Sequence, residues 1–141
     1  MYGLMVRSPW IELLLNGSKT WEIRGMNTNL RGIIALIKSG SGKVWGTCEI
    51  IDVKGPLTID DMLKNTIKHC ELLDGFEYKM PYKKTFAWVI SNPKPLKNRI
   101  SYVHPSGAIT WVRLPDSMLF NEFSHPHYEK QLSLFENLRN I

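Results

Sequence analysis

The sequence predicts an α+β fold built mainly from antiparallel strands, with short helices between them and a further helix at the C-terminus. Three observations favour this class. Apolar runs of strand length recur between turn residues, two segments among them carry apolar residues at helical spacing, and a third such segment closes the chain. With 141 residues, of which 43% are hydrophobic and 22% charged, the chain is long and apolar enough to bury one core.

The first strand is expected over residues 2–6, and a helix of about two turns follows it. Ser8 is a suitable N-cap residue, and Pro9 fits the first helical turn, where its missing N–H would have no partner anyway. Gly17 suits the left-handed position that ends a helix. We therefore expect the helix to lie between these residues.

Residues 19–24 change to the period of a strand. Trp21 and Ile23 alternate with polar residues, so we expect both to face the core. Glu22 and Arg24 then lie next to each other on the opposite face. A loop over residues 25–30 follows, which is long enough to reach over a pocket.

The middle of the chain is expected to form a hairpin and a second helix. Two apolar strands over residues 32–38 and 43–53 are joined by a Ser-Gly-Ser-Gly turn and should pair. Thr58 opens the helix as a cap, with Asp61 in the place of the capping-box acid. Its apolar stripe extends to the stop at Asp74-Gly75 and consists of Ile59, Met62, Leu63, Ile67 and, at its margin, Cys70.

The last strands are expected over residues 85–91, where Pro93 and Pro95 end the ladder, and as a final pair over residues 100–104 and 108–114. We expect residues 1–114 to form the domain and residues 115–141 to form a C-terminal extension. The extension carries one helical apolar stripe, which predicts a helix docked on the barrel; a partner-binding helix is the alternative. That stripe consists of Tyr128, Leu132, Phe135 and Leu138.

Four blocks of the sequence together resemble one known family. They are Pro9-Trp10 with the spaced Gly-x-Lys-x-x-Glu-x-Arg motif and a later Arg-Gly, residues 41–52, residues 86–93 and, more weakly, residues 108–111. In this order they resemble the ASCH domain, the activating-signal-cointegrator homology family. The resemblance covers roughly residues 4–114. It implies a PUA-like, mixed and largely antiparallel β-barrel with short helices at the rim. Because one fold hosts many activities, the resemblance indicates the fold more strongly than the function.

The resemblance also implies a ligand site near the first helix. A Trp stacks on a base, an Arg holds phosphate, and a Glu accepts from an amino group, so these residues suit a nucleotide. The alternative is a structural ion pair between Glu22 and Arg24, with the Trp packing its helix. The expected ligand-binding residues are Pro9 and Trp10 at the rim, Lys19, Glu22 and Arg24 as a polar floor, and Arg31 from the loop.

The hypothesis that the protein is an enzyme depends on Lys19 and Glu22. Some similar small proteins are amidohydrolases of acylated cytidine, in which a hydroxyl nucleophile stands three positions after the Lys. Glu22 occupies that position here, which argues against that chemistry. Ribonuclease activity is also ascribed to some family members, and a Lys19–Glu22 acid–base pair acting on a phosphodiester, with a 2′-hydroxyl as nucleophile, is the enzyme hypothesis.

Basic residues favour an anionic partner, in keeping with the net charge of +5. Lys79, Lys83 and Lys84 lie among aromatic residues in a loop, which suits the backbone of single-stranded nucleic acid; a solvated loop is the alternative. Lys94, Lys97 and Arg99 form a further basic run. We expect RNA or another nucleic acid, or a nucleotide-like small molecule, as the partner, with RNA favoured over DNA.

Other classes of function find no support in the sequence. The His69-Cys70 pair and His125 with His127 lack zinc-site spacing, and no glycine-rich phosphate loop occurs, so we expect no metal and no cofactor. No apolar run is long enough to cross a bilayer, the first residues lack the pattern of a signal peptide, and two cysteines are too few for a disulfide framework. A cytoplasmic protein is expected.

Overall fold

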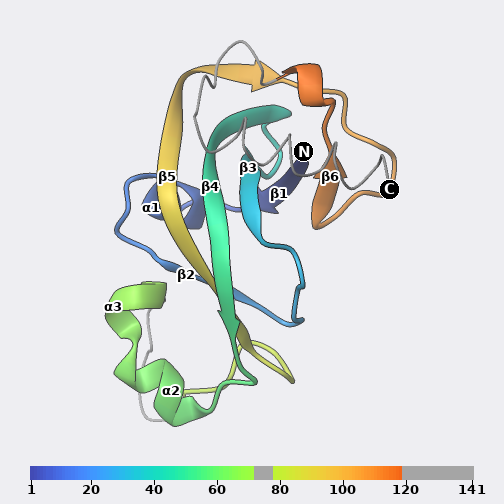
Figure 1. Cartoon of the computed structure of the whole chain (residues 1–141). Coiled ribbons are helices and arrows are strands. Elements are labelled where there is room, and N and C mark those ends of the chain that lie inside the picture. The colour runs from blue at the N-terminus through green and yellow to red at the C-terminus, as the bar shows by residue number, and fades with distance from the viewer. Residues whose placement is uncertain (72–77, 119–141) are drawn as a thin grey trace, which may run out of the picture.

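The part of the chain that the structure describes forms one curled, six-stranded sheet with three short helices, as a computed structural model shows (Figure 1). The structure describes residues 1–71 and 78–118. All neighbouring strands are antiparallel except the parallel pair β1–β3, which confirms the predicted mixed, largely antiparallel, PUA-like sheet. Across the sheet the strands are β2 (Trp21–Arg24), β5 (Phe86–Ser101), β4 (Lys43–Lys54), β3 (Gly32–Lys38), β1 (Tyr2–Val6) and β6 (Trp111–Arg113).

Helix α1 (Trp10–Leu15) lies where the sequence predicts it, but its cap differs. Pro9 is the N-cap, and the predicted capping by Ser8 is wrong: the Ser8 hydroxyl donates instead to Oε1 of Glu12, one turn on, at 2.8 Å. Gly17 follows the last turn with φ +84°, as expected. The helix buries Ile11, Leu14 and Leu15 against the sheet.

Thr58 and Asp61 form the predicted capping box of α2 (Ile59–Lys64). The single long helix is wrong, however, because Asn65 leaves helical geometry and its side-chain amide donates to the Asp61 carbonyl oxygen at 2.7 Å. A separate turn, α3 (Thr66–His69), follows, and it ends at Cys70 in the left-handed conformation. Of the predicted stripe only Met62 is fully buried. The predicted stop at residues 74–75 lies outside the described residues.

Strand β5 continues through the two prolines that were expected to end it. Its pairing with β4 is irregular there: Ser91 lies opposite Glu49, Pro95 opposite Gly46, and the register shifts between these pairs. A proline, which has no N–H, is tolerated where the hydrogen bonds between the strands are interrupted. The prediction that the two prolines end the strand is therefore wrong. Residues 100–101 continue the same strand opposite β4.

The predicted pairing of residues 100–104 with 108–114 is also wrong. Strand β6 pairs instead with β1, with Val112 opposite Gly3, so the first and last strands are neighbours. Strands β3 and β4 form the predicted hairpin, with Ala35 opposite Thr47. Beyond Asp116–Met118, a short 3₁₀ turn, the expected C-terminal helix lies outside the described residues. The predicted division at residue 114 stays a prediction.

Candidate functional site

Lys19 is the centre of the candidate site, and the backbone around it is held from three sides. Its N–H donates to the carbonyl oxygen of Leu13 at 3.0 Å, which returns the chain after α1. The next residue, Thr20, donates its N–H to the carbonyl of Lys68 before α3 ends, and its own carbonyl accepts from Ile90 of β5. These contacts turn the Lys19 side chain inward, and the residue is only 1% exposed.

The Lys19 ammonium meets one carbonyl, one carboxylate and one aromatic ring. Nζ donates to the carbonyl oxygen of His69, lies 3.9 Å from Oε1 of Glu22, and stands 4.9 Å from the ring centroid of Trp10. Burial lowers the pKa of Lys19, and the negative charges of Glu22 and Glu71 oppose that shift. A buried amine with a lowered pKa is a group of the kind that functional sites use.

Glu22 links Lys19 to Arg24 through its two carboxylate oxygens. Oε2 accepts from Nη2 of Arg24 at 2.9 Å, and the same nitrogen donates to the Met5 carbonyl oxygen of β1 at 2.8 Å. Oε1 accepts no hydrogen bond from any residue that the structure describes, although it is not among the side-chain atoms shut off from solvent without a partner. Oε1 therefore retains unused capacity to accept a hydrogen bond.

The burial of these residues corrects the expected polar strand face. Trp21 and Ile23 are buried as predicted, but Glu22 is also only 5% exposed. Glu22 lies opposite Trp88 of β5, and α3 brings His69 over the Lys19 end of the cluster. Glu22 shares its face with Trp88, which belongs to one core cluster, while Trp21 and Ile23 belong to another, so both faces of β2 are covered and the ion pairs of Glu22 are largely desolvated.

Two aromatic residues complete the surroundings of Arg24. Trp88 stacks on Trp111 with ring centroids 5.6 Å apart and an interplanar angle of 11°, and the Arg24 guanidinium lies 5.8 Å from the Trp88 ring centroid. The Trp88 indole N–H donates to the carbonyl oxygen of Met26 at 3.0 Å, which fixes the start of the loop after β2. Both Trp residues lie in sequence blocks that resemble the family, but no pattern in the sequence predicts that they lie beside Arg24.

Not every predicted site residue joins this cluster. The structure brings together Trp10, Lys19, Glu22 and Arg24. Arg31 donates instead to two carbonyl oxygens of its own loop, those of Thr28 and Leu30, both at 2.9 Å. Pro9 is exposed and serves as the cap of α1. The loop residues Lys79, Lys83 and Lys84 are exposed.

The helix α3 region adds residues that sequence reasoning missed. The His69 ring is fully buried; its Nδ1 accepts from the Glu71 N–H at 3.0 Å, while Nε2 lies 2.8 Å from the Met62 carbonyl oxygen. Burial raises the pKa of the Glu71 carboxyl, against the attraction of Lys19. No motif links these residues to Lys19 in the sequence, because the contact depends on how α3 packs.

The described part of the chain offers little support for other kinds of site. It contains no group of three or more His, Cys, Asp or Glu side chains suited to a metal ion. Cys48 and Cys70 are free thiols, and burial raises the pKa of Cys48. Among residues 1–71 and 78–118, no helix has the length and apolar character that crossing a bilayer requires.

Comparison with known proteins settles the family. The family model for the ASCH domain matches residues 4–99, which is more than half of the chain and includes the Lys19–Glu22–Arg24 cluster. The chain belongs to the ASCH domain family.

Solved structures support this ASCH fold. The ASCH protein of Zymomonas mobilis is similar, with a TM-score of 0.61 at 12% identity over 94% of each chain. Two mutants of that protein match with TM-scores of 0.61 and 0.56, at 13% and 14% identity; the first covers 94% of each chain, the second 94% of this chain and 96% of the other. At such identities the likeness concerns the fold alone. A search of curated protein sequences found no match.

Proposed function

We propose that this ASCH domain binds RNA and takes one nucleotide at the Lys19–Glu22–Arg24 cluster. The observation that carries the proposal is the unused hydrogen-bonding capacity of buried charges: Oε1 of Glu22 has no donor in the described structure, and the Lys19 ammonium lies 3.9 Å away. Because Oε1 is not shut off from solvent, a donor group of a ligand can take the place of water there without breaking a hydrogen bond within the protein.

A nucleotide has the groups that this cluster lacks. An exocyclic amino group of a base donates to Oε1 of Glu22, and Trp10, which is half-buried, offers ring area for stacking. Arg24 is the most exposed of the three charged residues, with 19% of its side chain accessible, and it supplies donors for phosphate. The positive net charge of the chain also favours an anionic ligand. The proposed location of this binding is the cytoplasm.

The test compares Glu22→Gln with the wild-type protein in nucleotide and RNA binding. Loss of the carboxylate leaves a ligand donor unpaired or weakly paired, which costs about 1–3 kcal/mol, a roughly fivefold to 150-fold loss of affinity. Asp52→Asn is the matched control, because Asp52 forms an exposed ion pair at the end of β4. Unchanged affinity of Glu22→Gln for every nucleotide and RNA tested would leave Glu22 a structural ion-pair residue. Crystals soaked in mixed nucleotides provide a second readout.

The basic loop is proposed to hold the RNA backbone. Lys79, Lys83 and Lys84 are exposed and form no ion pair with any residue that the structure describes. Contacts with phosphate release counterions, so binding should weaken as salt rises, and replacing all three lysines should flatten the dependence of log K on log salt by up to about 3. A triple variant with the wild-type slope would remove the loop from the interface.

The second candidate is a ribonuclease, favoured by the lowered pKa of Lys19 and the raised pKa of Glu71. A buried amine or carboxyl with a pKa moved toward neutrality is suited to acid–base work on a phosphodiester. In this case Glu22→Gln and Glu22→Ala lose RNA cleavage while RNA still binds. A pure binding protein retains RNA without forming product, so incubation of RNA with the wild-type protein separates the two candidates.

A further inference from the structure

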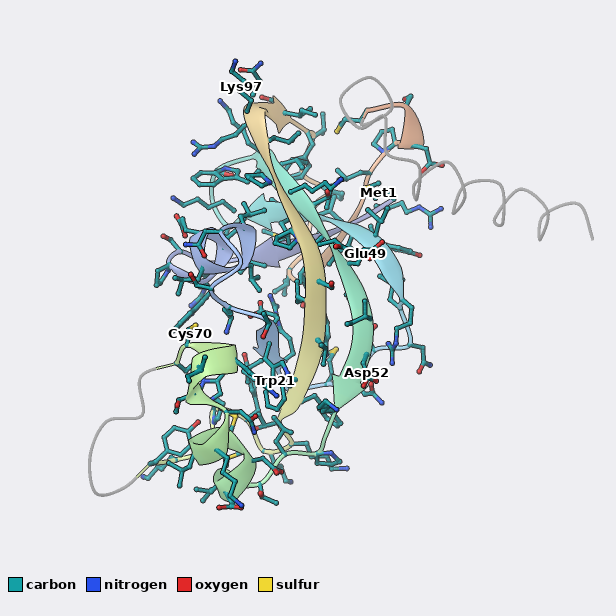
Figure 2. All side chains as sticks on the ribbon, turned by 60° about the vertical axis from the view of Figure 1, so that its left-hand side comes forward. Met1, Trp21, Glu49, Asp52, Cys70 and Lys97 are labelled. Carbon is teal, nitrogen blue, oxygen red and sulfur yellow. The ribbon has the colours of Figure 1, made fainter. Side chains whose placement is uncertain are left out.

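Strand β5 bulges away from β4 opposite Trp45. Val44 lies opposite Ile100, and Gly46 lies opposite Pro95, so Trp45 alone faces the four residues 96–99. Such bulges turn side chains away from the regular ladder. Figure 2 shows Lys97, in this bulge, at the top of the view, far from Trp21 and Cys70 in its lower half.

Arg99, the last residue of the bulge, packs its guanidinium against the ring of Trp45. Its guanidinium carbon lies 3.3 Å from the ring centroid, which places it over the face of the indole. Arg99 is exposed, and its guanidinium donates no hydrogen bond and forms no ion pair within the described residues. The ring contact thus holds the guanidinium in place while leaving its N–H donors available.

The charge around this stack is positive. Lys43, Lys94 and Lys97 are exposed on the same end of the β4–β5 ribbon, and none has an acidic partner in the part of the chain that the structure describes. We call Trp45 and Arg99, together with these three lysines, the bulge patch. Lys38 also lies over the Trp45 ring, at 4.5 Å, but Glu12 neutralises it at 3.4 Å.

The bulge patch and the proposed nucleotide site flank the same short helix. On one side of α1, Trp10 contacts the Lys19 ammonium. Two residues further on, Glu12 contacts Lys38, which lies against Trp45. A chain that leaves the nucleotide site past α1 therefore meets the bulge patch.

We propose that the bulge patch binds the phosphate backbone of the single-stranded RNA whose nucleotide occupies the Lys19–Glu22–Arg24 cluster, with Arg99 as the principal phosphate contact and Trp45 as its positioning residue. The inference rests on the proposed function. A guanidinium presents several donors to phosphate oxygens at once, and a guanidinium already held in place loses less freedom on binding. Unpaired lysines around it add counterion release.

The test measures fluorescence anisotropy with a labelled RNA of about ten nucleotides, alongside binding of mononucleotides. Arg99→Ala should lower RNA affinity several-fold at low salt and reduce the salt slope by about 1, with mononucleotide binding unchanged. Trp45→Leu should lower RNA affinity without removing a charge, and the double variant should be no weaker than Arg99→Ala. Arg99→Lys, which keeps the charge, should keep the slope and lose part of the affinity. Lys54→Ala, at the other end of β4, is the control.

The outcomes separate this proposal from the one on which it rests. If Arg99→Ala and Arg99→Lys both bind RNA with wild-type affinity and slope while Glu22→Gln weakens RNA and mononucleotides, the bulge patch is refuted and the nucleotide site stands. If Arg99→Ala weakens RNA binding but Glu22→Gln changes nothing, the bulge patch binds backbone and the nucleotide site is refuted. If the wild-type protein binds neither ligand, both proposals are refuted.

Discussion

Replacing Glu22 by Gln should destabilise the protein, because Lys19 then remains charged and buried without its nearest counter-charge. Lys19 is 1% exposed, and Glu22 is the carboxylate nearest to it in the described structure. Removing one partner of a buried ion pair typically costs 3–5 kcal/mol. We expect about 3 kcal/mol here, since Gln keeps an oxygen for Arg24 and Glu71 stays close to Lys19. For a domain of this size that loss lowers Tm by about 10 °C.

The effect should depend on pH in a defined direction. Burial holds the folded-state pKa of Lys19 below its ordinary value of 10.5, so between these two values the unfolded chain binds more protons than the folded one. The free energy of unfolding contributed by Lys19 therefore rises with pH through this window. In Glu22→Gln the folded-state pKa falls further, and the window opens at a lower pH. The difference between variant and wild type should thus shrink as the pH approaches 10.5.

Urea unfolding of both proteins at pH 7 and at about pH 9.5, followed by circular dichroism, measures this difference. Asp52→Asn serves as the matched control, because its exposed ion pair with Lys54 contributes roughly 0–1 kcal/mol. Equal urea midpoints for Glu22→Gln and wild type at pH 7 would refute the reasoning. A deficit that stays constant as the pH rises would show that the charge of Lys19 is not its cause.

Two further predictions concern the frame around the site. Gly46→Ala should lower the free energy of unfolding in urea by about 1–3 kcal/mol, because a Cβ there meets the Lys94 carbonyl oxygen at 2.5 Å. Gly3→Ala should cost less, because its Cβ meets the movable end of the Ile37 side chain. Equal losses for the two variants would argue against this explanation. Thr58→Ala removes the capping box of α2 and should cost about 1 kcal/mol by the same measurement, whereas no loss would mean that water replaces the cap.

Local patterns were sufficient to predict much of the fold. Alternating Trp21 and Ile23 marked the core face of β2, and the Thr58–Asp61 pair marked the start of α2. Both depend on contacts within a few residues. The course of β5 through Pro95 could not be predicted in this way, because the irregular partner strand is what makes the proline acceptable.

The candidate site was predictable in its residue types and not in its environment. The spacing of Lys19, Glu22 and Arg24 placed them on one strand segment, and the structure brings them together. That Glu22 is buried follows from the packing of α3 and β5, which joins residues distant in sequence. The stack of Trp88 on Trp111 depends on the pairing of the first and last strands, for which the sequence contains no local signal.

Strand β2 forms one edge of the sheet, since its four residues pair with β5 alone. Short edge strands open locally at a smaller free-energy cost than central strands such as β3 and β4. A molecule that binds Glu22 and Arg24 only while β2 is in place stabilises this strand against local opening. Amide hydrogen exchange at residues 21–24 should therefore slow when the site is occupied, so screening compounds by exchange at this one strand reveals a ligand before any reaction is known.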